Sequence, residues 1–518
     1  MNQNAQYDGY ISDITYTSGY YRTQAPANLA LAMLARGFMP PDLSSFRYLE
    51  LGFGQGLGLN IHGISNGGEF WGSDFNAQHA ANAHELASTS GANVTATSDS
   101  FEELLERKDL PKFDFISMHG VWSWIADKNR QEIVEILKRK LNPGGVLQVS
   151  YNCQPGWAAM VPLQHLLKLH KEIATDKSAD SRDSLKASIN FIEALSNADA
   201  AFFNAYPDAK EKLEWLKTQD LTYLVHELYN ENWPIIPFSD VADDLAKAKL
   251  TYIAPSNLLD HLDVFSLTPK HQEFLGKIGN TVLKETSRDL CMNRRFRSDV
   301  FAKGARQLNI EERNDRLRKF RFMLLQDPSN FDCSKIPAGT GTISLKKELA
   351  DPVINAIAKD GLSPKSVAEL EADKDVGKIP IGQLAEILIA LTGTDIIAPA
   401  QSDSDISASM EQCNKLNAEL LRRAEFEPQS NVLASPVLAA GLSCSRLQQL
   451  FLGAYKDGKK SQAEWVDHCW KKLQAQGHRI LRDGKPIESD KENLRILTEE
   501  AKAFKKGRLP VLEAHKII

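Results

Sequence analysis

The sequence predicts an α/β protein, with a Rossmann-like first domain followed by mainly helical middle and C-terminal domains. Strand-like and helix-like segments alternate between about residues 46 and 151, and a glycine-rich loop follows the first strand. After residue 156 the pattern becomes helical. At roughly 150 residues per domain, a chain of 518 residues suggests about three domains. We expect them to span residues 1–175, 176–330 and 340–518.

Five short apolar segments of the first domain are typical of strands, namely residues 46–51, 69–75, 93–97, 113–118 and 146–151. Helix-like segments separate them at residues 57–64, 77–90, 101–106 and 129–141. Strands that alternate with helices form βαβ units, which build a buried parallel sheet. We therefore expect the ligand of this domain to lie at the carboxyl ends of the strands.

The rest of the chain favours helices, which we expect at residues 157–175, 183–201, 207–217 and across 266–330. Between them, residues 221–255 bend at the prolines of 234–237 and enter a helix with Ser239 as its N-cap. A linker rich in Pro, Gly, Ser and Asp is expected at 327–342. Farther on, two helices, one of them at 381–393, and a following strand suggest a winged-helix-like module, whose balanced charge favours protein contacts over DNA.

Composition and charge exclude several classes of protein. No run approaches the roughly 18 apolar residues of a membrane span, and the first twenty residues lack the features of a secretory signal. Six scattered cysteines without a CxxC motif argue against disulfides and for the reducing cytoplasm. Residues 1–150 hold 11 basic and 16 acidic residues, so −5 of the net charge of −6 lies there. No segment is basic enough to indicate a nucleic-acid partner.

The most informative motif is the loop that runs from Gly52 to Gly58 after the first strand. A dinucleotide site needs GxGxxG, but Leu57 occupies the position of its third glycine, and the motif present is GxGxG with Glu50 two residues before it. This pattern resembles the first motif of class I S-adenosylmethionine (SAM) methyltransferases. A carboxylate such as Glu50 suits the cationic, phosphate-free SAM. The alternative is a glycine-rich turn in another kind of α/β protein.

Further polar residues follow the next strands in the same order. Asp74, with Phe75 beside it, ends the second strand, where a carboxylate can accept both ribose hydroxyls. Asp99 and Ser100 follow the third strand, where the superfamily contacts adenine, and the turn at 142–145 resembles its "LxPGG" motif. Asp74 could instead cap a helix, and Asp99 could be an ordinary loop residue. The features together predict SAM as the cofactor.

Other segments resemble bacterial methyltransferases that carry a methyltransferase regulatory domain, a group similar to the lysine methyltransferases of outer-membrane proteins. They are HGVWSWI (119–125), VSYNCQPGW (149–157), 7–37, 221–255 and 288–301, and the resemblance covers about residues 5–305. It implies that the cofactor is bound by Tyr21, Thr23, Glu50, Gly52, Gly54, Gly56, Asp74, Asp99 and His119. The "THP" motif of the family appears here as Thr23-Gln24-Ala25-Pro26, so any role of its histidine is lost.

Aromatic and polar residues at the fourth and fifth strand ends are candidates for the chemistry. Trp122, Trp124, Tyr151 and Trp157 could form a pocket that desolvates an amine and attracts its cationic form, although each could equally belong to the core. His119 could relay a proton or be structural, and Asn152 could hold the nucleophile. Trp122 and Tyr151 are the favoured aromatics because they follow the strands directly. The pair His226–Glu227 lacks HExxH spacing, so we expect no metal.

The first hypothesis for function is a SAM-dependent methyltransferase that modifies a protein side chain, with lysine favoured. The expected partner is a protein substrate, an outer-membrane protein before its export, met in the cytoplasm. A homodimer is one expectation for the assembly. The alternatives are a small-molecule or glycan methyltransferase and a non-catalytic SAM-binding scaffold.

Overall fold

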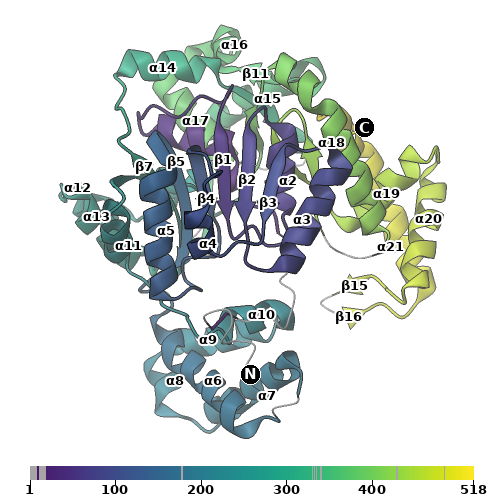
Figure 1. The fold of residues 1–518 in the computed structure, drawn as a ribbon. Coiled ribbons are helices and arrows are strands. Elements are labelled where there is room, and N and C mark those ends of the chain that lie inside the picture. The colour runs from purple at the N-terminus through teal and green to yellow at the C-terminus, as the bar shows by residue number, and fades with distance from the viewer. Residues whose placement is uncertain are drawn as a thin grey trace.

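The computed structural model describes residues 9, 10, 19–176, 179–328, 331, 333, 335–338, 341–426, 430–482 and 485–518. Its centre is a seven-stranded sheet in the order β3-β2-β1-β4-β5-β7-β6 (Figure 1). The first five strands run parallel to one another, and β6 and β7 run antiparallel to their neighbours. The strands are β1 (Arg47–Leu51), β2 (Glu69–Ser73), β3 (Val94–Thr97), β4 (Phe113–Met118), β5 (Leu141–Asn152), β6 (Leu250–Pro255) and β7 (Phe296–Lys303).

The first domain confirms the predicted alternation of strands and helices. Strands β1, β2 and β4 are almost wholly buried, as expected for apolar segments covered by crossover helices, whereas the edge strand β3 is only half-buried. The strand order reverses between β1 and β4, which is where an open α/β sheet leaves a crevice for its ligand. The helices are α2 (Leu57–Ser65), α3 (Ala77–Ser90), α4 (Phe101–Glu106) and α5 (Asp127–Lys140).

The prediction that residues 266–330 are helical is wrong at two strands, β7 and β8 (Arg321–Leu324). Along β7 the charged residues Arg297 and Asp299 are buried, because the guanidinium of Arg297 binds Asp299 and also Asp289. The charged sequence therefore resembles a solvated helix although it forms an inner strand of the sheet. Both β6 and β7 come from the region expected as the middle domain, and they complete the sheet of the first.

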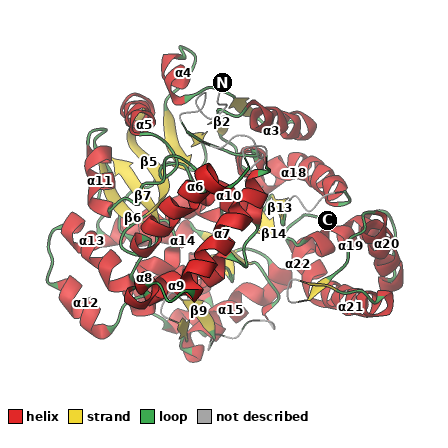
Figure 2. Cartoon of the chain, turned by 90° about the horizontal axis from the view of Figure 1, so that it is seen from below, coloured by secondary structure: helices red, strands yellow, loops and turns green. Residues whose placement is uncertain are grey.

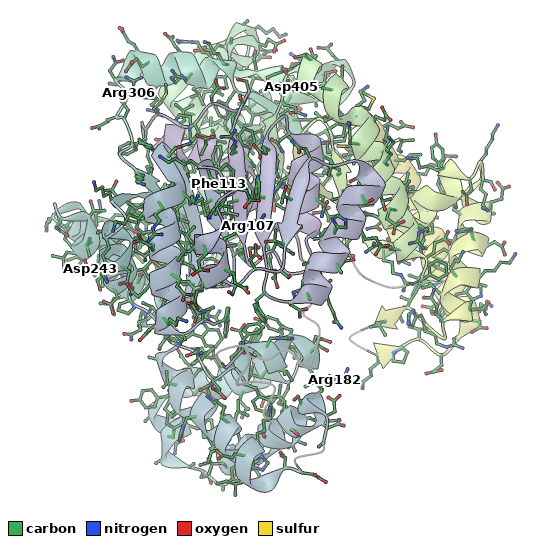
Figure 3. All side chains as sticks on the ribbon, viewed as in Figure 1. Arg107, Phe113, Arg182, Asp243, Arg306 and Asp405 are labelled. Atoms are coloured by element: carbon green, nitrogen blue, oxygen red, sulfur yellow. The ribbon has the colours of Figure 1, made fainter. Side chains whose placement is uncertain are left out.

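A helical bundle covers the carboxyl edge of the sheet. Figure 2, seen from below, shows α6, α7 and α10 in front of the strands, and Figure 3 labels Arg182 in this bundle, below Phe113 of the sheet. The bundle consists of α6 (Val161–Ala174), α7 (Ser181–Asn197), α8 (Ala201–Ala205), α9 (Pro207–Leu216) and α10 (Leu221–Leu228).

After the bundle, four helices precede, separate and follow the last two strands of the sheet along the chain: α11 (Phe238–Ala246), α12 (Pro269–Gly276), α13 (Thr281–Met292) and α14 (Ile310–Lys319). Ser239 is not the N-cap of α11. The N-cap is Pro237, two residues earlier, and the Ser239 hydroxyl bonds Asp240 instead. Proline suits this end of a helix because it has no N–H group to leave without a partner.

The C-terminal region lies beside and above the sheet and is mostly helical (Figure 1). The two helices and the strand at 397–400 are present, and their winged-helix interpretation stays a prediction. The linker expected at 327–342 lies partly outside the described residues. The helices are α15 (Lys347–Leu362), α16 (Val367–Ala372), α17 (Ile381–Gly393), α18 (Asp403–Ala424), α19 (Arg446–Lys456), α20 (Gln462–Ala475), α21 (Asp490–Ala503) and α22 (Leu509–Ala514). The strands are β9 (Ile336–Ala338), β10 (Gly341–Ile343), β11 (Lys365–Ser366), β12 (Ile397–Ala400), β13 (Val432–Ser435), β14 (Ala440–Ser443), β15 (Leu481–Arg482) and β16 (Lys485–Pro486).

The N-terminal segment reaches the sheet through a short 3₁₀ turn (Arg22–Gln24) and the buried helix α1 (Pro26–Ala35). Of the expected segment 7–37, residues 7, 8 and 11–18 lie outside the described residues. Within the described ranges, none of the helices combines the length and the apolar character needed to cross a lipid bilayer.

Candidate active site

A cavity of about 590 Å³ lies at the carboxyl ends of β1, β2, β4 and β5. The glycine-rich loop forms one wall, α10 and residues of the bundle form another, and the N-terminal segment contributes Tyr10, Tyr21 and Gln24. Its ionisable lining is mainly acidic, with Glu50, Asp74, Asp99, Glu227 and the one described arginine, Arg295. An acidic cavity of this size favours a cationic ligand.

The glycine-rich loop needs glycine for two reasons. Gly52, Gly54 and Gly56 all have positive φ, at 70°, 57° and 73°, a conformation that glycine adopts without strain. Space is also short, because a Cβ atom on Gly52 would lie 2.5 Å from Val121 and one on Gly56 2.3 Å from the Cβ of Ala83. Gly52 and Gly54 line the cavity, whereas Gly56 lies behind them, where the loop packs on α3.

Asp74 holds the loop in place from the end of β2. Its carboxylate accepts the N–H group of Gly54 at 2.8 Å and that of Asn76 at 3.0 Å, and it lies 3.1 Å from Nδ1 of His79. Asp74 and its neighbour Phe75 both line the cavity. A carboxylate fixed in this way is oriented before any ligand binds.

Asp99 and Ser100 lie in the cavity wall after β3, as the sequence predicts. Asp99 forms an ion pair with Arg107 at 2.9 Å, near the lower edge of the sheet in Figure 3. Ser100 caps α4 with a capping box. These contacts hold in place the two polar residues that follow β3 in the cavity wall.

Glu50, next to the last residue of β1, is the most buried carboxylate of the site, with 5% exposed. Burial raises its pKa to about 8, against the opposing effect of a hydrogen bond from Gln24 at 3.4 Å. Among the described residues its Oε2 atom has no hydrogen-bond partner. A buried oxygen without a partner is costly unless a ligand binds it. This oxygen and the glycine loop fit the cationic SAM that the resemblance implies.

His119 and Tyr21 lie side by side in the cavity wall. Their rings stack with centroids 3.6 Å apart, and Nδ1 of His119 lies 3.2 Å from the Ser150 hydroxyl. Burial lowers the pKa of His119 to about 4, so the imidazole is neutral at pH 7. Thr23, two residues after Tyr21, does not line the cavity.

The two favoured aromatics, Trp122 and Tyr151, are not in the cavity. Trp122 is fully buried in the core beside β4 and α5. Tyr151 is 1% exposed and donates its hydroxyl to Asp299 on β7 at 2.8 Å. Successive residues of a strand point to opposite faces, so Asn152 reaches the cavity and Tyr151 turns away from it. Trp124 and Trp157 do line the cavity.

Glu227 of α10 marks a second end of the cavity, and the sequence did not single it out for this role. It is 8% exposed, and its Oε1 atom lies 3.4 Å from Nδ2 of Asn152, which donates to it. Burial raises its pKa to about 7, while hydrogen bonds from Asn152 and Tyr223 oppose that rise. The aromatic rings of Trp157 and Trp215 also line the cavity.

We distinguish two parts of the cavity lining by the elements that form them, and call them the cofactor end and the acceptor end. The cofactor end holds the glycine loop, Glu50, Asp74 and Asp99, and the acceptor end holds Asn152, Tyr223, Glu227 and the tryptophans. In the part of the chain that the structure describes, no group of three or more His, Cys, Asp or Glu side chains is arranged to hold a metal ion.

Sequence models of two families match the chain. The one described as "Methyltransferase domain" covers residues 49–147, which contain the end of β1, the glycine loop, β2 to β4 and the first half of β5. The one described as "Predicted methyltransferase regulatory domain" covers residues 220–303, which contain α10 with Glu227 and also β6 and β7. The two matches thus fall on the two ends of the cavity.

Relatives extend over the whole chain. The uncharacterized protein sll1526 of Synechocystis is 32% identical over 508 residues, 98% of each chain. RP789 of Rickettsia prowazekii is 25% identical over 60% of this chain and 56% of its own length. The solved structure of PKMT2 from Rickettsia typhi in complex with AdoHcy covers 96% of this chain and 99% of its own, with a TM-score of 0.68 and 19% identity. The likeness to PKMT2 shows a shared fold.

Proposed function

Since the chain belongs to the class I SAM-dependent methyltransferases that carry a methyltransferase regulatory domain, we propose that it methylates the side-chain amine of lysine in a protein. The observation that carries this proposal is the acceptor end of the cavity. There a buried carboxylate, Glu227, is hydrogen-bonded by Tyr223 and lines the same cavity as the aromatic residues Trp157 and Trp215. Carboxylates and aromatic faces both attract an ammonium group.

A lysine acceptor must lose a proton before its lone pair can attack. With a reference pKa near 10.4, this deprotonation costs about 4–5 kcal/mol at pH 7. Glu227, whose pKa burial raises to about 7, can accept the proton near neutral pH, as an efficient general base should. Asn152, hydrogen-bonded to Glu227, holds the carboxylate in position.

The bound SAM supplies a methyl group on a sulfonium ion. The residues of the chain align the amine with that methyl group, take up the proton at Glu227 and exclude water from the acceptor end of the cavity. Holding the two reactants in one cavity replaces an encounter in solution by a reaction within a complex. The acidity of the whole lining also favours a cationic acceptor.

The whole-chain likeness to PKMT2, a protein lysine methyltransferase, supports a protein substrate. The resemblance of residues 5–305 to methyltransferases of outer-membrane proteins extends the proposal to such a protein, modified in the cytoplasm before its export. The domain division at residues 175, 330 and 340 and a homodimer remain predictions.

The test is transfer of a radiolabelled methyl group from SAM to cell-envelope protein, followed by amino-acid analysis of the labelled chain. We expect labelled methyl-lysine, and we expect Glu227→Gln to lower kcat by about 10²–10⁴-fold, the usual contribution of a general base. Calorimetry should show unchanged SAM affinity in this variant. The matched control is Glu231→Gln, which changes an exposed glutamate just beyond α10 that does not line the cavity.

Each alternative has its own outcome. Labelled small molecules or glycans without labelled protein would replace the proposed substrate. SAM binding without any S-adenosylhomocysteine formation would indicate a scaffold. A kcat in Glu227→Gln equal to that of the control would remove Glu227 from the chemistry.

A further inference from the structure

Residues 20–24 connect the C-terminal domain to the cofactor end of the cavity. Tyr21 and Gln24 line the cavity. Tyr20 instead contacts β14, and Arg22 contacts a residue just before β12. Both contacts span more than 370 positions of the chain. One short segment thus has two faces with different partners.

Tyr20 forms the first of these contacts. Its hydroxyl accepts the N–H group of Gly441 on β14 at 2.7 Å and lies 3.2 Å from Nε2 of His62 on α2. A Cβ atom on Gly441 would come within 2.8 Å of the Tyr20 ring, so the strand approaches the ring as closely as only glycine allows. Since α2 begins at the glycine-rich loop, Tyr20 joins that helix, the N-terminal segment and the C-terminal domain.

Arg22 forms the second contact. Its guanidinium forms an ion pair with Asp395, which precedes β12, and Nη2 donates to the carbonyl of Gly441 at 3.4 Å. The arginine side chain is only 15% exposed, whereas Asp395 is 76% exposed. The two contacts hold the segment from the same side.

The opposite side of the segment carries the cavity residues. The 3₁₀ turn is closed by backbone hydrogen bonds from Gln24 to Tyr21 at 3.1 Å and from Ala25 to Arg22 at 2.9 Å, so its residues are fixed relative to one another. Tyr21 stacks on His119, and Gln24 donates to Glu50 at 3.4 Å and to Ser117 at 2.9 Å.

We propose that the C-terminal domain is a positioning element of the cofactor site, and that Tyr20 and Arg22 are the positioning residues through which it acts. The domain sets the placement of Tyr21 and Gln24, and through Gln24 that of the Glu50 carboxylate. This role concerns SAM binding and does not depend on the identity of the methyl acceptor.

The test compares three variants of the full chain. Tyr20→Phe removes the bridging hydroxyl, and Asp395→Asn removes the charge facing Arg22 at an exposed position whose φ of 55° asparagine tolerates. The control Asn66→Ala removes a different contact of the same interface, the 2.9 Å hydrogen bond from Asn66 to the carbonyl of Ala439, together with its 3.0 Å bond to the backbone carbonyl of His62. This contact touches none of residues 20–24.

We expect calorimetry with SAM and with S-adenosylhomocysteine to show Kd values raised roughly fivefold to tenfold in Tyr20→Phe, the effect of one hydrogen bond, and less in Asp395→Asn. The kcat at saturating SAM should stay unchanged, and hydrogen exchange at residues 20–25 should accelerate in both variants. Asn66→Ala should lower Tm without changing Kd. Unchanged Kd values in both test variants, or an equal rise in Asn66→Ala, would overturn the proposal.

Discussion

The two ends of the cavity are built in different ways. Most of the cofactor end comes from one stretch of chain, between Glu50 and Phe101, in which successive strands place their final residues side by side, and Tyr21 and Gln24 complete it. The acceptor end is assembled from Asn152 of β5, Trp215 of α9 and Glu227 of α10, three elements that all lie outside that stretch. The first depends mainly on backbone conformation and the second on packing between distant helices. Cofactor binding and acceptor choice should therefore respond to different substitutions.

The largest effect confined to the cofactor end is expected from Gly56→Ala. The new Cβ would lie 2.3 Å from Ala83 at a φ of 73°, which combines a clash with backbone strain of about 1–3 kcal/mol. We expect SAM affinity to fall about a hundredfold or more, measured by calorimetry. Gly91→Ala is the matched control, because Gly91 has a φ of 71° but nothing within 4 Å of the added Cβ. Equal loss of SAM affinity in both variants would contradict the role of the close packing.

A smaller effect, on stability alone, is expected from Tyr151→Phe. This variant removes the 2.8 Å hydrogen bond to Asp299, which should lower the free energy of unfolding by about 1.5–3 kcal/mol, as for a bond to a charged group. Because Tyr151 lies outside the cavity, KM for SAM and for the acceptor should not change. Denaturant unfolding and steady-state kinetics measure the two quantities. A shift in either KM would show that Tyr151 contributes to substrate binding.

The smallest of the three effects is a pH dependence of SAM binding. Burial raises the pKa of Glu50 to about 8, so its carboxyl is mostly protonated at pH 6 and ionises as pH rises. A cationic ligand favours the ionised form, so SAM affinity should increase about tenfold between pH 6 and 7.5. Calorimetry at several pH values should show this slope for the native chain and a flat profile for Glu50→Gln. The same slope in both would assign the titration to another group.

Stability without cofactor should change in the opposite direction. A carboxyl whose pKa is raised on folding stabilises the folded state below its ordinary pKa, and this contribution is lost as pH rises through about 8. We therefore expect Tm of the cofactor-free protein to fall between pH 6 and 8, less steeply in Glu50→Gln. Glu227, with a pKa raised to about 7, adds to the fall in both proteins.

The strand-end residues of the cofactor end could be predicted because local sequence places them. The glycines from Gly52 onward and Asp74 occupy positions set by strand ends, and the strand order follows from βαβ connections. Trp122 and Tyr151 were misplaced because adjacency to a strand end does not fix the face to which a side chain points. Of two neighbours on β5, only Asn152 faces the cavity.

The acceptor end could not be predicted because its key residue has no motif. Glu227 lies in the apolar helix LTYLVHEL. The sequence there suggests only a metal site, and the spacing of His226 and Glu227 argues against one. A buried acid in such a helix is a weak signal on its own, since only the fold brings Asn152 to it. The strand β7 could not be predicted for a similar reason. The charges of Arg297 and Asp299 neutralise each other in a buried ion pair, which only the folded structure shows.

The pairing of β5 with β7 also has a consequence during synthesis of the chain. Asn152 of β5 pairs with Phe296 of β7, so one edge of β5 has no strand beside it until the ribosome has made the whole intervening region. At roughly 5–20 residues per second this takes on the order of ten seconds or more. An unpaired edge is open to pairing with other chains. A fragment that stops near residue 176 would keep that edge permanently, so the catalytic part of this protein should be produced only together with the segment that closes its sheet.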